Sequence, residues 1–507
     1  MKGLKYGVMG AGLLGLLLLL PNCTYVPFDA PRTETTALPP GGSVARMADT
    51  LTAGQSTGVT AAPLTDGNDA LGARLRLIER AERSIDLQTF LIKPDTAGAL
   101  IWLALYEAAE RGVRVRLLYD DVFTTARDDQ IATLDAHPNV EIRSFNPLSR
   151  NSIYAMNFVL DFRRVNRRMH NKSLIIDNAI AIIGGRNVAD EYYQIGTDSE
   201  FADFDMLVAG APVAKLSRGF DLYWNDKWSV PLAALEQGDP EALGIALEEF
   251  RAAEDSEAAE VYARAVNAPY LDDLLKGAEP MFRGRADFYV DDPDKLRNRP
   301  YTGPFVLEEA YYDALSRAES SLIVLTPYFV PEKTGAAFFS QMAQRGVKVR
   351  IVTNSLASTN HPYVHGHYSR YRQQLLAAGV EIIEVRVDAP FLTGRLDAPL
   401  TLHTKLAVID DDAVFVGSNN IDPRSFRQNT ELGMLIESPT LARYILNRLN
   451  SAASDYAFDV QRQPQNDNLW LYTGAGRDEV FKREPLASFF RKIVATVSGW
   501  LPIESQL

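Results

Sequence analysis

Two stretches of the chain, His170-Asn171-Lys172-Ser173-Leu174-Ile175-Ile176-Asp177 and His403-Thr404-Lys405-Leu406-Ala407-Val408-Ile409-Asp410, follow one pattern, H-x-K-x4-D, at an offset of 233 residues. Two further pairs of segments repeat at nearly the same offset: 184–187 with 417–420, and 111–116 with 345–350. A period this long is far outside the range of solenoid repeats. The chain therefore contains two halves that share one ancestral unit.

Each half alternates apolar, β-branched runs with helix-like segments. In the first half the pattern predicts a strand over 84–92, a helix over 97–111 and a strand over 113–119. The second half repeats this order over 322–329, 335–345 and 347–353. Such alternation is typical of α/β proteins. We expect two β-sheet-centred halves, flanked by helices and packed pseudo-symmetrically around one active site.

The length of 507 residues is sufficient for several units with sizeable cores. The sequence predicts these boundaries: a signal segment over 1–22, a flexible Pro-, Thr- and Gly-rich tether over 23–65, an N-terminal half over 66–230, an acidic, Ala-rich helical connector over 231–300, a C-terminal half over 301–475 and a C-terminal amphipathic helix within 476–507.

Composition narrows the classes of function. A charged fraction of 23% and an aromatic fraction of 10% are ordinary for a folded protein. The formal net charge of −13 makes a nucleic-acid partner unexpected, because a phosphate backbone is bound by basic surfaces. The single Cys excludes an intramolecular disulfide framework and a Cys-rich zinc module.

The N-terminus has the features of a targeting segment. Lys2 and Lys5 precede an uncharged stretch over 6–20, which is short for a membrane span, and Cys23 follows it. This arrangement resembles a bacterial lipoprotein signal, which implies lipidation of Cys23, with an uncleaved anchor or plain secretion as alternatives. The same stretch contains a G-x-G-x-x-G match over 10–15, which we interpret as fortuitous because no strand precedes it.

The repeated motif suits chemistry on an anionic group. In an extended segment, residues two apart project from the same face, so His170 and Lys172 converge, as do His403 and Lys405. Two halves facing each other would supply two imidazoles and two ammonium groups. That set provides a nucleophile, an acid/base and a cationic clamp for a phosphate without a metal or cofactor.

The chain resembles the phospholipase D superfamily, whose H-x-K-x4-D motif it contains twice and intact over nearly its whole length after about residue 70. Within that superfamily it is most similar to bacterial cardiolipin synthases and their phospholipase D-like lipoprotein subgroup. The segments that carry the closer resemblance are 166–172, 184–187, 353–356 and 501–504.

The resemblance implies roles for individual residues. His170 would attack the lipid phosphorus and form a phosphatidyl-histidine, and His403 would act as acid and base, although these two roles could be reversed. Lys172 and Lys405 would neutralise the non-bridging oxygens. The family's phosphate-contacting amides correspond to Asn187 and Asn420.

A catalytic imidazole also needs an acceptor that orients it. Asp203 and Glu431 follow the two motif histidines at comparable distances and are the candidates, with Asp205 as a competitor of Asp203. Asp177 and Asp410 complete the catalytic signature, and we expect their role to be structural rather than chemical.

Three other features leave alternatives open. His361, His365 and His367 favour a loop or the lining of an acceptor pocket over a metal site. Between 161 and 172, five basic residues accompany a single acid, which indicates either a solvated basic face or capture of anionic headgroups. Apolar residues at helical spacing between 486 and 501 indicate either core packing or an interfacial membrane helix.

The leading hypothesis is a phosphatidyltransferase that makes cardiolipin from phosphatidylglycerol and a second phospholipid. A phospholipase D hydrolase that releases phosphatidic acid is the nearest alternative, since only the acceptor differs. A nuclease of the same superfamily and a non-catalytic scaffold are weaker ones. We expect anionic phospholipid substrates, a membrane surface as partner, an active site complete within one chain, and a membrane-associated, periplasm-facing location in a bacterial envelope.

Overall fold

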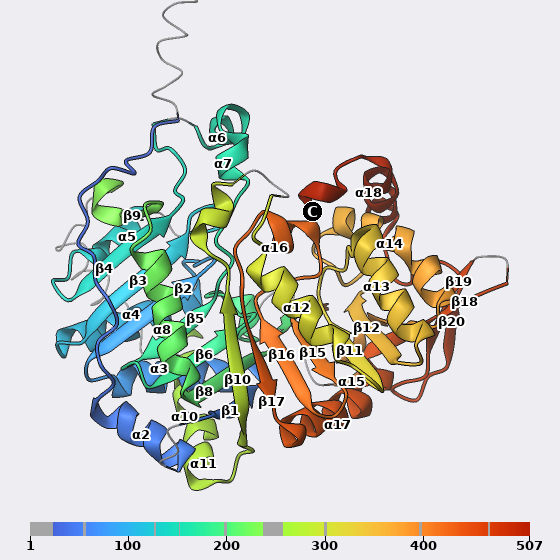
Figure 1. Cartoon of the computed structure of the whole chain (residues 1–507), viewed down its shortest axis with the longest axis horizontal. Coiled ribbons are helices and arrows are strands. Elements are labelled where there is room, and N and C mark those ends of the chain that lie inside the picture. The colour runs from blue at the N-terminus through green and yellow to red at the C-terminus, as the bar shows by residue number, and fades with distance from the viewer. Residues whose placement is uncertain are drawn as a thin grey trace, which may run out of the picture.

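The computed structural model describes residues 24–53, 57–125, 128–151, 153–196, 200–236, 257–298, 302–394, 398–464 and 467–507 (Figure 1). The signal segment, Cys23 and the Gly-rich match over 10–15 lie outside these ranges. None of the helices in the described ranges is both long enough and apolar enough to cross a bilayer.

The first half of the chain contributes these elements: α2 (Gly42–Thr52), β1 (Val59–Leu64), α3 (Gly67–Arg80), β2 (Ser84–Thr89), α4 (Thr96–Glu110), β3 (Arg114–Asp120), α5 (Asp128–Asp135), β4 (Val140–Phe145), α6 (Tyr154–Leu160), α7 (Phe162–Val165), β5 (Ser173–Ile176), β6 (Ile180–Gly184), η1 (Asp190–Tyr192), β7 (Glu200–Ala202), β8 (Asp205–Gly210), α8 (Pro212–Trp224), β9 (Ser229–Pro231) and η2 (Leu232–Ala234).

The second part of the chain contributes these: α10 (Glu257–Asn267), α11 (Tyr270–Lys276), β10 (Phe282–Val290), η3 (Pro293–Leu296), α12 (Val306–Ser316), β11 (Ser321–Leu325), α13 (Glu332–Gln344), β12 (Lys348–Asn354), α14 (Pro362–Ala377), β13 (Glu381–Val385), α15 (Ala389–Thr393), β14 (Leu400–Leu402), β15 (Leu406–Ile409), β16 (Ala413–Gly417), α16 (Pro423–Arg427), β17 (Leu432–Glu437), α17 (Pro439–Tyr456), β18 (Ala457–Arg462), β19 (Asn468–Tyr472), β20 (Glu479–Phe481), α18 (Phe489–Trp500) and η4 (Glu504–Gln506).

The strands of the described ranges pair into one continuous sheet, apart from β7 and β14. From edge to edge the order is β9-β4-β3-β2-β5-β6-β8-β1-β10-β17-β16-β15-β11-β12-β13-β18-β19-β20. The order is pseudo-symmetric about the antiparallel β1–β10 pair, with β2, β3 and β4 corresponding to β11, β12 and β13. The predicted duplicated α/β fold is therefore confirmed, and the strands and helices expected around 84–119 and 322–353 are present.

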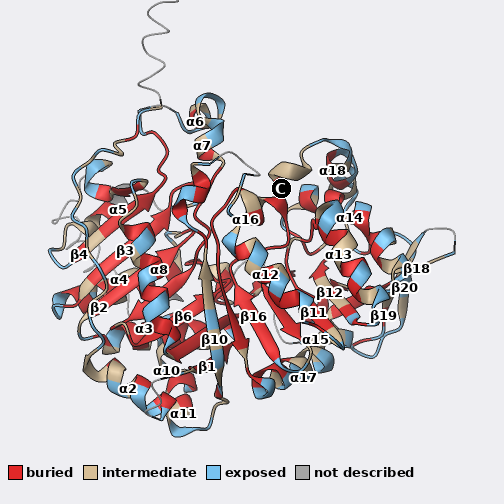
Figure 2. Ribbon diagram, in the orientation of Figure 1, coloured by how far each residue is buried: buried red, intermediate tan, exposed pale blue. Residues whose placement is uncertain are grey.

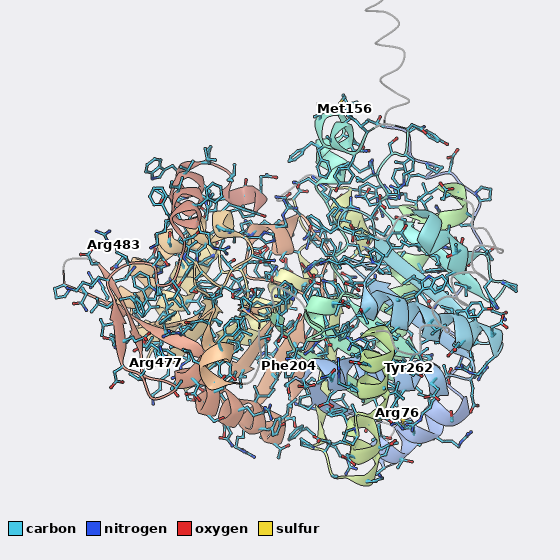
Figure 3. The ribbon with its side chains drawn as sticks, turned by 180° about the vertical axis from the view of Figure 1, so that it is seen from behind. Arg76, Met156, Phe204, Tyr262, Arg477 and Arg483 are labelled. Carbon is cyan, nitrogen blue, oxygen red and sulfur yellow. The ribbon has the colours of Figure 1, made fainter. Side chains whose placement is uncertain are left out.

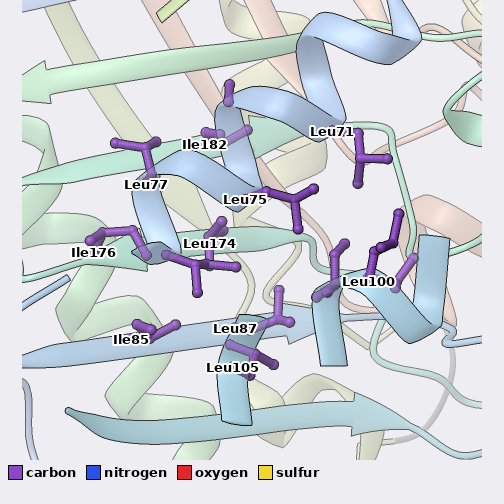
Figure 4. Close-up of a cluster of buried hydrophobic side chains, with 14 of the residues drawn as sticks. Leu71, Leu75, Leu77, Ile85, Leu87, Leu100, Leu105, Leu174, Ile176 and Ile182 are labelled. Atoms are coloured by element: carbon purple, nitrogen blue, oxygen red, sulfur yellow. The ribbon is translucent and has the colours of Figure 1, made fainter. Parts of the chain in front are cut away.

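Alternate side chains of the two motif strands enter different cores. In β5, Leu174 and Ile176 pack beneath α3 and α4, in the cluster drawn in Figure 4, whereas Ile175 faces a central core. In β15, Ala407 and Ile409 likewise enter the outer core of the second half, and Leu406 and Val408 enter the central one. A strand buried on both faces needs an unbroken apolar run, which both motifs supply. Both motif strands are buried along their whole length, within the buried interior that Figure 2 shows.

The expected tether over 23–65 is wrong for most of its length. Residues 42–52 form α2, and 59–64 form the fully buried strand β1. Before α2 the chain is extended but bound along the first half: the Thr35 amide donates to Asn225 Oδ1 at 3.1 Å and the Ala37 amide to Asp221 Oδ2 at 2.9 Å. Pro- and Thr-rich composition indicates that a segment lacks periodicity, not that it lacks partners.

The boundaries of the repeat also shift. The connector expected over 231–300 contains α10 and α11, but it also contains β10, which pairs with β1 and β17 and joins the two halves. Because β10 corresponds to β1, the first structural unit begins with β1, before helix α3, and the second begins with β10, before helix α12. The starts expected at 66 and 301 are therefore both too late. One face of β10 is exposed, so its alternating pattern lacks the apolar run that marks the buried strands.

Candidate active site

Each motif histidine lies beside a segment of the other half. The backbone amide of His170 donates to Thr430 O at 2.9 Å, and that of His403 donates to Ala202 O at 2.8 Å. The second contact extends the two-stranded parallel sheet of β7 and β14. These exchanged contacts place both motifs at the junction of the halves, where they form one composite site.

The orienting carboxylates are exchanged in the same way. His170 Nδ1 lies 2.9 Å from Glu431 Oε2, and His403 Nδ1 lies 2.6 Å from Asp203 Oδ2. Each acid therefore serves the histidine of the other half, a pairing that spacing along the sequence does not reveal. Each carboxylate accepts a hydrogen bond from the Nδ1–H group, which leaves the lone pair of the neutral imidazole on Nε2.

The two acids are held differently. Glu431 accepts a hydrogen bond from the Ser418 hydroxyl. At the equivalent place in the first half stands Gly185, where an added Cβ would lie only 2.1 Å from Asp203 Oδ1. The closer approach of the shorter acid therefore requires glycine. Asp205 does not compete for a histidine, because Arg74 and Arg186 bind its carboxylate.

The two lysines lie where the motif spacing predicts. Lys172 Nζ donates to His170 O at 2.7 Å, and Lys405 Nζ donates to His403 O at 2.6 Å. Both side chains are buried. Burial disfavours the charged form and lowers the pKa of Lys172 to about 7 and that of Lys405 to about 8. The site thus concentrates positive charge that an anion would stabilise.

Burial also governs the histidines and their acids. It lowers the pKa of both His170 and His403 well below the ordinary value, and the two lysine charges lower them further. Burial raises the pKa of Asp203, and raises that of Glu431 to about 7. Both imidazoles are therefore neutral before substrate arrives, and a neutral imidazole is the nucleophilic form.

Aromatic rings that sequence reasoning missed surround the histidines. Phe90 meets the His170 ring edge-on at 4.7 Å between ring centroids, and Phe201 stacks on His403 at 5.2 Å. Tyr192 meets His403 edge-on at 5.1 Å. None of these rings belongs to a motif, although Phe201 lies two residues before Asp203. They pack against both imidazoles, which are buried.

The two asparagines lie at the ends of equivalent strands, three residues after β6 and β16. Asn187 Nδ2 donates to the Tyr192 hydroxyl at 2.7 Å, and the backbone amide of Asn420 donates to Ser425 Oγ at 3.1 Å. The Oδ1 atoms of both are buried without a hydrogen-bond partner among the described residues. A polar atom buried in this way is costly unless it meets a ligand, a water or a moving neighbour.

The motif aspartates lie away from the reacting groups, at the far ends of β5 and β15. Asp177 accepts hydrogen bonds from the backbone amides of 82–84, and Asp410 from those of 319–321. Each fastens the motif strand to the start of the neighbouring strand β2 or β11. These backbone contacts are of the structural kind that the sequence predicts for both aspartates.

The basic segment before His170 is largely structural. Arg164 pairs with Asp161, and Arg168 pairs with buried Asp120 at 2.9 Å while donating to Asn146 O. Arg167 donates to the backbone oxygens of Leu296 and Asn298. Neither a solvated face nor a headgroup-binding cluster describes these three arginines. Clustered arginines in sequence gave no sign that each had a buried acceptor.

The three histidines after β12 separate on folding. His361 lies beside the site, between Tyr328 and Tyr363, and its charge would lower the pKa of His403. His365 lies in a cluster with Glu384 and Glu484 that has the spacing of a metal site. The guanidinium of Arg372 contacts all three residues of that cluster at 2.9 to 3.2 Å and serves as its cation.

The geometry defines a class of protein: a duplicated α/β chain in which each half supplies one His–Lys pair and the carboxylate for the other half's histidine. A family model described as "Cardiolipin synthase, PLD-like domain" matches residues 75–208 and 311–452, more than half of the chain. The protein belongs to this family of phospholipase D-like cardiolipin synthases.

Individual relatives agree with this placement. Cardiolipin synthase C of Escherichia coli (strain K12) is 34% identical over 449 residues, which cover 87% of this chain and 95% of that protein. A cardiolipin synthase of Alkalihalophilus pseudofirmus is 24% identical over 443 residues, covering 86% and 71%. The crystal structure of a phosphatidylserine synthase from Haemophilus influenzae Rd KW20 has the same fold, with a TM-score of 0.57, 14% identity and coverage of 90% and 96%.

Proposed function

We propose that this protein is a phosphatidyltransferase that makes cardiolipin from phosphatidylglycerol and a second phospholipid. The observation that carries the proposal is the composite site, in which two buried neutral imidazoles and two buried lysines lie close enough for each lysine charge to act on both histidines. Both halves of this set come from one chain, so no second copy is needed to complete it. Relatives named cardiolipin synthases support the choice of reaction.

In the first step, His170 Nε2 attacks the phosphorus of phosphatidylglycerol. The bond from phosphorus to the glycerol headgroup breaks, and His403 donates a proton to the departing oxygen, leaving a phosphatidyl-histidine. The bound phosphodiester anion offsets the lysine charges that lower the pKa of His403, so substrate binding favours the imidazolium that this step requires. Lys172, Lys405, Asn187 and Asn420 would bind the non-bridging oxygens.

In the second step, His403 accepts the proton of an acceptor hydroxyl, whose oxygen attacks the phosphorus and breaks the bond to His170. A second phosphatidylglycerol as acceptor gives cardiolipin, and water gives phosphatidic acid. The buried site and its aromatic walls favour a lipid alcohol over water. We further propose that lipid-modified Cys23 attaches the protein to a bacterial membrane on its periplasmic side.

The test is a product analysis. Purified full-length protein is incubated with labelled phosphatidylglycerol, with and without phosphatidylethanolamine, and the lipids are separated. Labelled cardiolipin with release of glycerol supports the transferase. Phosphatidic acid as the only product would favour the hydrolase, and DNA cleavage without lipid turnover would overturn both.

The alkaline side of the pH profile follows from the lysines. A lysine is charged below its pKa, so the free enzyme loses phosphate-binding charge as the pH rises through the values of about 7 for Lys172 and about 8 for Lys405. We expect kcat/KM to fall over this range. A bound phosphodiester raises both pKa values, so kcat should fall only at a higher pH.

The measurement uses initial rates with a short-chain, monomeric phosphatidylglycerol from about pH 6 to about pH 10. Circular dichroism at each pH serves as the control for folding. Superimposable profiles of kcat and kcat/KM, both flat to the alkaline end, would contradict the assignment of the lysines as the phosphate clamp.

A further inference from the structure

Helix α18 presents its large apolar side chains to solvent. Phe489, Phe490 and Trp500 are 79%, 72% and 79% exposed, and Ile493 and Val497 are also exposed. The expectation of core packing for this helix is therefore wrong. Five large exposed apolar residues in a helix of 12 residues indicate an interaction site rather than scattered surface hydrophobes.

The side of α18 that packs is made of small residues. Ala495 and Ser498 lie against α14 at Gly366, where an added Cβ would lie 2.1 Å from Ala495 O. Arg491 donates to Leu356 O at 2.9 Å and Ser498 Oγ donates to Tyr363 O at 3.2 Å. The helix is thus held firmly by its small-residue side while its aromatic side remains uncovered.

A second group of exposed apolar residues lies on α6 and α7. Ile153 and Val159 are 73% and 71% exposed, and Tyr154 and Phe162 are more than half exposed. Figures 1 and 3 show α6, which carries Met156, at the same end of the molecule as α18 and the C-terminus. We call the exposed apolar residues of 153–162 and 489–501 the apical surface.

The two parts of the apical surface are joined by the C-terminal residues. Asn166, directly after α7, donates to Gln506 Oε1 at 2.9 Å, and Arg424 donates to both Asn166 Oδ1 and Gln506 O. The turn η4 that contains Gln506 begins four residues after the end of α18. The relative position of the two helices is therefore fixed by hydrogen bonds.

The composite site connects to both parts of this surface through aromatic residues. Phe90 contacts the His170 ring on one side and the Phe123 ring on the other, and Phe123 is more than half exposed. Next to Phe123, Val122 O accepts a hydrogen bond from the Tyr154 hydroxyl of α6 at 2.8 Å. On the other side of the site, the His361 ring contacts the Tyr363 ring. The backbone carbonyl of Tyr363 accepts a hydrogen bond from Ser498 Oγ of α18. Aromatic contacts and hydrogen bonds thus link both parts of the apical surface to the surroundings of the motif histidines.

The start of the described chain lies at the same end. The guanidinium of Arg164, in α7, covers the Phe28 ring at 5.5 Å, so the chain enters the described structure beside α7. The apolar stretch over 6–20 and Cys23 precede this point. Exposed Arg163 and partly exposed Lys492 add positive charge, whereas the neighbouring acids Asp161 and Glu504 are paired with arginines.

We propose that the apical surface is the membrane-docking face, with α6, α7 and α18 lying in the interfacial layer of an anionic phospholipid bilayer and the site opening between them. Apolar side chains enter the acyl boundary, and the basic residues meet lipid phosphates. A bilayer accounts for the position of both helices and of the start of the described chain at one end of the molecule. The proposed docking face rests on the proposed function in one respect, namely that the substrate is a lipid.

Tryptophan fluorescence tests the docking directly. Of the five tryptophans, Trp500 alone is exposed; the other four are buried or half-buried. In full-length protein reconstituted into phosphatidylglycerol vesicles, brominated acyl chains should quench a component of the emission that Trp500→Phe removes. Phe489→Ser with Phe490→Ser should abolish the quenching and lower turnover of vesicle lipid at least tenfold, while turnover of monomeric short-chain phosphatidylglycerol stays within twofold.

Val480→Ser is the matched control, because Val480 is an exposed apolar residue of β20, outside the apical surface. It should leave quenching and both activities unchanged. An unquenched Trp500 in the wild-type protein would overturn the proposal. Variants whose only change is the loss of self-association would also overturn it, because that result would assign the apical surface to contact with a second copy of the chain. Quenched Trp500 in a protein that turns over no lipid would support the docking and refute the proposed reaction.

Discussion

Replacing His170 by Ala is expected to lower cardiolipin formation by at least about 10³-fold and to remove the covalent intermediate, because the phosphatidyl group then has no nitrogen to receive it. His403→Ala should lower formation to a similar extent for a different reason, the loss of the acid and base. With a p-nitrophenol leaving group, which departs without a proton, His403→Ala should still form the adduct, and the adduct should accumulate.

Mass spectrometry of acid-sensitive, alkali-stable phosphatidyl peptides measures the adduct, and product analysis measures turnover. His137→Ala is the matched control, since His137 pairs with Glu110 away from the site. An adduct in His170→Ala that is missing in His403→Ala would reverse the two roles. Near-normal turnover in either variant would refute the composite site.

The exchange of carboxylates between the halves predicts a second large effect. Asp203→Asn should lower kcat by roughly 10²- to 10⁴-fold, the range of a general acid–base contribution, because it removes the acceptor that orients His403. Glu431→Gln should lower kcat comparably by disturbing His170. The two variants should differ in the step that they impair.

The p-nitrophenol substrate separates these steps in a rapid-mixing experiment. Asp203→Asn should retain the burst of p-nitrophenol and lose steady-state turnover, whereas Glu431→Gln should lose the burst. Asp205→Asn tests specificity: Asp205 binds arginines, so its loss should lower the thermal midpoint without altering the burst of the folded fraction. A burst that survives in Glu431→Gln and disappears in Asp203→Asn would contradict the crossed pairing.

The docking and the chemistry can be separated experimentally because they occupy different residues. Trp500 and Phe490 lie on the apical surface, and His170 and His403 are buried between the halves. Within the basic segment, Arg164, Arg167 and Arg168 are instead occupied by structural partners around the loop before His170, and Arg163 remains exposed. Attraction to anionic lipid by a protein of net charge −13 therefore depends on local residues and on apolar contact.

The sequence by itself determined the repeat, the α/β class and the two His–Lys pairs that fold into one composite site. Two copies of one motif with an apolar run can bury both faces of a strand, and His and Lys two residues apart must share a side of it. It also identified Asp203 and Glu431 as carboxylates near the motifs. These features are local, and local spacing is what a sequence records directly.

Tertiary structure alone decided which carboxylate serves which histidine, where the repeat begins and which side of α18 is covered. His170 meets Glu431 across 261 positions of the chain, a distance at which spacing has no predictive power. Residues 59–64 of the expected tether form β1 because β8 and β10 pair with them. The arginines before His170 have structural contacts because Asp120 and backbone oxygens are buried beside them. Pairing, burial and exposure are properties of surfaces brought together by folding.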